Sequence, residues 1–125
     1  MIQSIQAVLI PANIIGSYAA PITVLPAPPA GFINNILGIS HQTAGGTAYT
    51  TASKLLYSSG GTKFMEDDAV LAATGSYNSP ALKSAATQTI FSTTQAVTVT
   101  TDALAATGTS TINAYIIYEQ IQIGA

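Results

Sequence analysis

Charged residues are scarce in this chain. Of its 125 residues only three are basic and five are acidic, so 6% are charged where about 25% is usual. Thr, Ser, Ala, Asn and Gln take their place, so we expect a surface that is polar but hardly ionic. The only cations are Lys54, Lys63 and Lys83, too few for a basic stripe along phosphates, which argues against nucleic acid as a partner.

Cysteine and long apolar runs are missing as well. Zero cysteines exclude a disulfide framework and a thiolate metal site. The mean hydropathy is +0.42, yet no run approaches the roughly 18 apolar residues of a spanning helix, so no membrane contact is predicted. The first cation is Lys54 and the apolar run "AVLI" stops at Pro11, so no signal peptide is predicted.

Short segments rich in Ile, Val, Thr and Tyr recur between clusters of Gly, Pro, Ser and Asn. This pattern is typical of many short strands. It predicts an all-β fold with little helix: one antiparallel, jelly-roll-like β-sandwich domain over residues 1–125. The expected strands are residues 2–10, 20–25, 32–41, 47–58, 88–92, 95–101 and 110–122.

The connections have their own signals. The prolines of "LPAPPAG" predict a stiff connector, and glycine pairs on both sides of residues 47–58 predict turns. Two brief helices are expected. "EDDAVLAATG" offers Asp67 or Asp68 as a cap, and "NSPALKSAA" offers Ser79 before Pro80.

No catalytic constellation stands out. His41 is the single histidine, and the sequence sets no triad or metal partners near it, so a structural or surface role is expected. The acids Glu66, Asp67 and Asp68 could hold a hard cation, but they lack the alternating spacing of a calcium loop, and a negatively charged helix start accounts for them better. We therefore predict no enzyme, no metal and no cofactor.

The six tyrosines allow two interpretations. They could form a platform on which sugars stack, as aromatic side chains do in binding modules. The absence of Trp, which gives the largest stacking surface, argues against this, and packing in the core and at subunit contacts is favoured. The tyrosines are Tyr18, Tyr49, Tyr57, Tyr77, Tyr115 and Tyr118.

The last strand is apolar on both faces. One face carries Ile112, Ala114, Ile116 and Tyr118. The other carries Tyr115, Ile117, Ile121 and Ile123. A sandwich buries only the inward face of each sheet, so we predict that the second set contacts another subunit in a homo-oligomer.

Several stretches together resemble small structural proteins of tailed bacteriophages. The resemblance covers roughly residues 5–122: a leading strand, the corner "PITVLPAPPAGFI", the glycine-bounded "GGTAYTTASKLLYSSGG" and the terminal "STINAYIIYEQI". It implies an all-β head decoration or cement protein of the virion, often trimeric, that is made in the host cytoplasm and sits on the lattice of the major capsid protein. It carries over no catalytic residue.

With this resemblance the N-terminal segment becomes a candidate for shell binding. Residues 1–18 could form an extended arm that adds a strand to a neighbour's sheet edge. Its predicted contact residues are Ile2, Ile5, Val8 and Ile10. A receptor- or glycan-binding head-fibre or tail-tip module is the alternative function. A clamp predicts an exposed apolar and Thr-rich patch near this segment, whereas a binder predicts a concave pocket with clustered Tyr, Asn and Asp.

Overall fold

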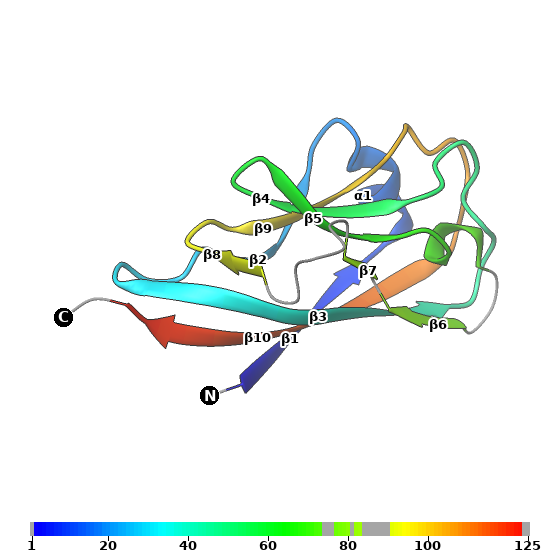
Figure 1. Cartoon of the computed structure of the whole chain (residues 1–125). Coiled ribbons are helices and arrows are strands. Elements are labelled where there is room, and N and C mark those ends of the chain that lie inside the picture. The colour runs from blue at the N-terminus through cyan, green and yellow to red at the C-terminus, as the bar shows by residue number, and fades with distance from the viewer. Residues whose placement is uncertain (1, 74–76, 81, 84–90, 124–125) are drawn as a thin grey trace.

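The computed structural model describes residues 2–73, 77–80, 82–83 and 91–123. Two antiparallel five-stranded sheets lie face to face (Figure 1). The predicted all-β sandwich is thereby confirmed. The first sheet has the order β1-β10-β3-β6, with β8 also on β3, and its strands are β1 (Ile2–Leu9), β10 (Thr111–Gln122), β3 (Phe32–Ala44), β6 (Tyr77–Pro80) and β8 (Phe91–Thr93).

The second sheet has the order β2-β9-β4-β5-β7. Its strands are β2 (Ile22–Leu25), β9 (Val97–Thr101), β4 (Leu55–Ser59), β5 (Thr62–Asp67) and β7 (Leu82–Lys83). The alternation predicted for β9 is confirmed, because Val97 and Val99 are buried while Thr98 and Thr100 are only half-buried.

The core lies between the two sheets. In β10 the side chains of Ile112, Ala114 and Ile116 are 0% exposed, so the inward face assigned from the sequence is confirmed. Phe64 on β5 stacks on Phe91 on β8, with ring centroids 4.2 Å apart, and this pair joins the two sheets directly. A stacked aromatic pair contributes about 0.5–1.5 kcal/mol beyond the burial of its surface.

Part of the expected N-terminal arm is helical. Helix α1 (Pro11–Gly16) begins with proline, whose fixed φ suits the first helical position. Ile14 in this helix is 1% exposed and belongs to the core, while residues 2–9 form a strand paired with β10. The structure thus differs from an extended segment over residues 1–18, because burial of Ile14 favours a helical turn.

The strand expected over residues 47–58 is much shorter. Only Leu55–Ser59 forms β4, and Thr51 has a positive φ of 69° that interrupts any ladder. The Thr50 hydroxyl bonds to the hydroxyl of Thr107, which is distant in sequence, and the Thr51 hydroxyl donates to the neighbouring carbonyl oxygen of Thr50. The turn predicted after this segment is confirmed, because Gly60 and Gly61 both have positive φ and connect β4 to β5 in a hairpin. Strand β5 itself was not predicted.

The helix expected in "NSPALKSAA" is wrong within the described residues. Tyr77–Pro80 and Leu82–Lys83 are strands, and residues 81 and 84–86 lie outside the described part, as do residues 88–90 of an expected strand. Ser79 does not cap a helix because its hydroxyl donates to Asp67. Pro80 is tolerated because β6 lies at a sheet edge.

The helix expected in "EDDAVLAATG" is confirmed in shorter form. It is the 3-10 turn η1 (Val70–Ala72), and Asp67 rather than Asp68 accepts the backbone N–H groups of Ala69 and Val70, at 2.8 and 3.0 Å. The side-chain acceptor at the start of the turn satisfies amides that otherwise have no partner.

Candidate functional site

The outward face of the first sheet carries the residues predicted from the last strand. Strand register aligns its side chains in rows across the sheet. Tyr115 of β10 pairs with Gln6 of β1 on one side and with Ser40 of β3 on the other, and Ser40 also pairs with Pro80 of β6. The next row contains Val8, Asn113, Gln42 and Asn78.

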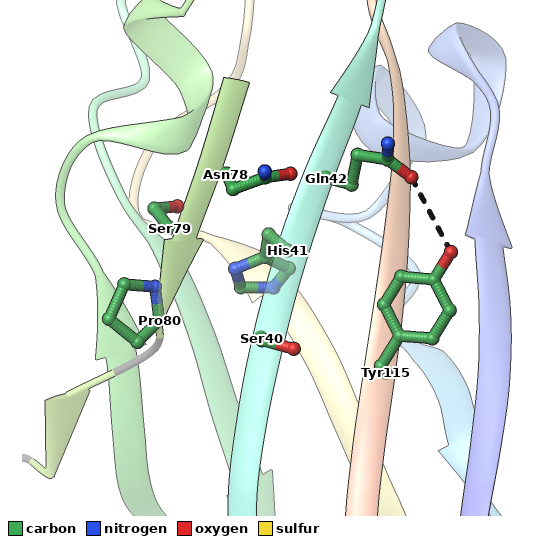
Figure 2. Close-up of a pocket in the computed structure, with 7 residues that line it drawn as sticks. All are labelled: Ser40, His41, Gln42, Asn78, Ser79, Pro80 and Tyr115. Carbon is green, nitrogen blue, oxygen red and sulfur yellow. Dashed lines mark hydrogen bonds between the residues drawn. The ribbon is translucent and has the colours of Figure 1, made fainter. Parts of the chain in front are cut away.

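A hollow opens on this face beside β3. It has a volume of about 340 Å³, and we call it the Ser40 hollow. Figure 2 shows Tyr115 and Pro80 on opposite sides of Ser40, with the Gln42 and Asn78 amides toward one end. The lining residues are Ser40, His41, Gln42, Asn78, Ser79, Pro80 and Tyr115.

A buried polar network lies beneath the hollow. His41 Nδ1 is 2.7 Å from Asp67 Oδ2, and His41 Nε2 is 2.5 Å from the Tyr57 hydroxyl. The Ser79 hydroxyl donates to the same Asp67 oxygen over 2.5 Å. His41 and Asp67 are each 2% exposed and Tyr57 is 0% exposed. The network therefore ties β3 and β6 of the first sheet to β4 and β5 of the second.

The protonation of this network suits a structural role. Burial raises the pKa of the Asp67 carboxyl, but hydrogen bonds from His41, Ser79 and the Ala69 amide outweigh it and lower the pKa to about 2. Burial, with the Asp67 charge, raises the pKa of the Tyr57 hydroxyl, which stays a neutral donor. Ser79 bonds to Asp67 and not to His41, so the geometry lacks the serine–histidine contact of a nucleophilic pair. The structural role expected for His41 fits this arrangement.

The other acids of the predicted helix start lie outside the network. Glu66 faces Lys54 at 3.1 Å and Lys63 at 3.6 Å, and Asp68 lies 4.0 Å from Lys54. Among the residues that the structure describes, no group of three or more His, Asp or Glu side chains is placed to hold a metal ion. No helix in this same part of the chain is long and apolar enough to cross a membrane.

The four predicted interface residues all belong to the outward face of β10 and its end. Ile117 is 39% exposed and Ile123 is 58% exposed, while Tyr115 and Ile121 are half-buried. Ile33 of β3 pairs with Ile121, and Ile2 of β1 lies in the row between Ile121 and Ile117. We call this cluster the apolar end: Ile2, Ile33, Ile117, Ile121 and Ile123. Tyr115 lies apart from it, beside the Ser40 hollow.

The four predicted arm residues divide between two faces. Ile2 and Val8 are 65% and 52% exposed on the outward face of β1, and Ile10, just after the strand, is 47% exposed. Ile5 points inward and packs against the core. Strand β1 is the last strand at its side of the sheet: one of its edges pairs with β10, and its other edge pairs with no strand of the part of the chain that the structure describes.

The charged residues concentrate on the second sheet and its loops. Glu66 and Asp67 lie in β5 with Lys63, Lys83 lies in β7, and Lys54, Asp68 and Asp102 lie in adjoining loops. In the first sheet Glu119 is the single charged residue within the strands that the structure describes. The two outward faces therefore differ sharply, and the first face is nearly free of charge.

The tyrosines that the structure describes divide between the core and the surface of the chain. Tyr49 and Tyr57 are buried in the core, which confirms core packing for these two. Tyr118 is half-buried and donates to Gln3, whereas Tyr18 is 54% exposed. The side chain of Tyr77 lies outside the described residues. Tyr115 lines the Ser40 hollow on the outward face.

Sequence reasoning missed most of the hollow. Ser40, Gln42, Asn78 and Pro80 were not singled out as site residues, because Ser79 and Pro80 read as a helix start. The alternation in "GISHQTA" already places Ser40 and Gln42 on one face of a strand. What the sequence could not supply was the pairing of β3 with both β10 and β6, since register between distant strands depends on tertiary structure.

Comparison with known proteins gives one informative likeness. No family model and no curated protein matches this chain. The fold is similar to a chain of the cyanophage Pam1 capsid asymmetric unit, with a TM-score of 0.54 and 19% sequence identity. The match covers 94% of this chain and 82% of that chain. A likeness at this identity establishes a shared fold.

Proposed function

We propose that this protein is a non-enzymatic structural component of a virion, a decoration or cement protein that binds the capsid shell and stabilises it. The observation that supports this best is the fold shared with a chain of a phage capsid asymmetric unit over 94% of the sequence. Cementing requires adhesion and no turnover, and the buried pairing of His41, Asp67 and Ser79 fits a chain without catalytic work.

The apolar end supplies a surface that such attachment needs. Exposed isoleucines that gather on one sheet face are typical of a protein contact rather than of a free surface. Burial of one such side chain contributes about 1.5–3 kcal/mol, before the cost of association is deducted. Glu119 is the one acidic residue in the same rows. Contacts here are therefore apolar or hydrogen-bonded, with few ion pairs.

A homotrimer is the assembly that we propose for these contacts. Closed symmetric oligomers are the rule among soluble proteins, and threefold symmetry suits a capsid's local axes. Tyr115, Ile117, Ile121 and Ile123 form the proposed subunit interface. The proposed contact with the shell is the unpaired edge of β1, near which Ile2, Val8 and Ile10 are exposed. A strand of a shell subunit can pair with this edge. Ile5 packs against the core, so it is not part of the proposed shell contact.

An image of the particle tests this function directly. Cryo-electron microscopy of purified virions should show density of this fold on the outer surface of the shell, in contact with neighbouring shell subunits. The edge of β1 should face those shell subunits. Density confined to a tail tip, or none on the head, would contradict the cement proposal.

A second candidate is a receptor- or glycan-binding module, and one observation favours it. The Ser40 hollow is concave and brings Tyr115 and Asn78 together, two of the three residue types that a binder predicts. No Asp reaches its surface, because Asp67 lies buried beneath it. Density on a fibre or tail tip would favour this candidate over the first.

A further inference from the structure

We propose that the Ser40 hollow binds one ring of a neutral saccharide. This inference rests on the second candidate function, glycan binding, and gives it a site and a ligand class. The hollow is drawn from three adjacent strands, β10, β3 and β6, so rigid elements hold its walls. Its volume of about 340 Å³ lies at the lower end of the range of about 300–1,000 Å³ for small-molecule pockets.

The shape of the hollow follows from side-chain size along one row. Ser40 is short, and it pairs with Tyr115 on one side and with Pro80 on the other. Two rings therefore flank a low floor (Figure 2). Two residues along β3, Gly38 has no side chain, and a Cβ built there would meet nothing within 4 Å. Gly38 therefore adds no side chain to this face of β3.

The two walls suit the faces of a sugar ring. A pyranose presents C–H groups on its faces and hydroxyls around its edge. The flat apolar ring of Tyr115 can stack on those C–H groups, while its hydroxyl remains available at the rim. The Tyr115 hydroxyl is only 3.5 Å from Gln42 Oε1, a long contact that a ligand hydroxyl can replace at little cost.

The polar groups at the hollow match sugar hydroxyls. Gln42 and Asn78 pair across β3 and β6, so their amides lie side by side at one end of the hollow. An amide offers donors and an acceptor together, as neighbouring hydroxyls do. Within the described part of the chain, the side chains of Ser40 and Asn78 form no hydrogen bond to another residue. They are exposed to solvent and free to bind a ligand.

The lining selects against charged ligands. The one basic residue among its described lining residues is His41, which is 2% exposed and has both ring nitrogens bound, to Asp67 and Tyr57. No lysine is among the described residues that line the hollow, so a carboxylate or phosphate would lose its hydration without gaining a cation from them. A neutral sugar loses only hydroxyl hydration, which the amides and Ser40 restore.

The hollow overlaps the proposed subunit interface at one residue, Tyr115, and Ile117 lies only two residues, or about 7 Å, farther along β10. A partner subunit that covers Tyr115 would therefore compete with a saccharide. A shell contact at the edge of β1 would not, because the hollow is formed by β10, β3 and β6. The inference is thus independent of shell attachment.

Saturation-transfer difference NMR on the intact protein tests the site. The probes are methyl α-D-glucopyranoside, methyl β-D-galactopyranoside and methyl α-D-mannopyranoside, with sodium glucuronate as the charged comparison. We expect at least one neutral glycoside to bind in the millimolar range, with the largest transfer at ring C–H protons, and to bind more tightly than glucuronate. Absence of binding by all three, or tighter binding of glucuronate, would overturn the proposal.

Matched variants locate the binding. Ser40→Leu fills the floor and Asn78→Leu removes one amide, and each should weaken binding by about tenfold or more, which is about 1.4 kcal/mol. Ser4→Leu is the control, because it is the same serine-to-leucine change as Ser40→Leu, on the same outward face but in the row of Gly38. It should leave the affinity for the sugar within about twofold. Amide NMR spectra confirm that each variant is folded.

Two results would count against this location. Unchanged affinity in folded Ser40→Leu would place the sugar elsewhere. Loss of the oligomer in Ser40→Leu, with no sugar bound by the wild type, would mean that a partner chain fills the hollow. Shell occupancy is measured separately, so failure of the capsid proposal leaves this result standing, and the reverse also holds.

Discussion

At the scale of single residues, Asp67 contributes most to the linkage between the sheets. It accepts hydrogen bonds from His41 and Ser79 and from the amides of Ala69 and Val70, all in a site that is 2% exposed. Buried carboxylates with this many donors are stabilised in the charged form. Removing the charge leaves donors without an acceptor, which is costlier than losing a surface contact.

The variant Asp67→Asn should therefore destabilise the fold. We expect a loss of about 1–3 kcal/mol in free energy of unfolding, because the amide cannot accept from every donor and places its own N–H₂ against others. Urea denaturation at fixed protein concentration measures it. The adjacent Asp68→Asn is the control: Asp68 is 60% exposed, and its change should stay within about 0.5 kcal/mol. Equal losses in both variants would contradict the role of Asp67.

The stability that Asp67 contributes should be lost at low pH. The pKa of Asp67 is lowered from 3.8 to about 2 in the folded protein. When folding lowers a pKa, the charged group stabilises the folded state. This stabilisation is fully present at a pH above the pKa of the unfolded chain, and it is lost as the pH falls through the pKa of the folded protein. The wild type should therefore lose about 2 kcal/mol between about pH 4 and pH 2 that Asp67→Asn does not lose. Urea titrations at several pH values check this, and parallel curves for the two proteins would contradict it.

At the scale of elements, β10 is central to the account because its two faces have different roles. Its inward residues belong to the core, and its outward residues remain exposed or half-buried in the single chain. The proposed subunit interface explains why isoleucine recurs on the outward face, where a sheet in contact with water is usually polar.

The oligomer should depend on the outward face of β10. Size exclusion with light scattering should give three times the 12.7 kDa chain mass for the wild type at micromolar concentration. Tyr115→Ser and Ile117→Asp should shift it toward the monomer, because they remove interface area or place a charge there. Ile116→Val is the control, since it deletes one core methylene at a cost of about 0.5–1.5 kcal/mol. A monomeric wild type, or equal dissociation by all three variants, would contradict the interface.

Some strands and turns could be predicted from the sequence and others could not. Alternation in β9 and β10 was sufficient to assign their inward faces, since a period of two survives any choice of partner. The pair Gly60–Gly61 located the turn after β4, because a positive φ is a local property of glycine, but the second strand of the hairpin, β5, was not predicted. The strand predicted over residues 47–54 and the helix start predicted at Ser79 were wrong. Hydroxyls there bond to partners distant in sequence, Thr107 and Asp67, which local patterns do not indicate. For the Ser40 hollow, local alternation placed Ser40 and Gln42 on one face of a strand, but the strands on either side of them depend on pairing between distant segments, which no local signal indicated.

At the scale of the whole molecule, charge is distributed unevenly between two outward faces. Charged residues occupy the second sheet and its loops, and the first sheet offers isoleucine, amides and hydroxyls. A partner that docks on the first sheet or on the β1 edge gains little from ion pairs. Its attachment rests on apolar burial and backbone hydrogen bonds, which salt screens far less than surface charge.

Re-addition of the protein to stripped particles tests the central claim most directly. Particles that lack it are mixed with wild type or with the double variant Ile2→Asp/Val8→Asp, at low and at high ionic strength. Bound copies and the temperature of genome release are then recorded. We expect wild type to bind equally at both ionic strengths and to raise the release temperature with occupancy, while the double variant binds less. Wild-type occupancy that collapses at high salt, or full binding that leaves the release temperature unchanged, would contradict a cement protein held by uncharged contacts.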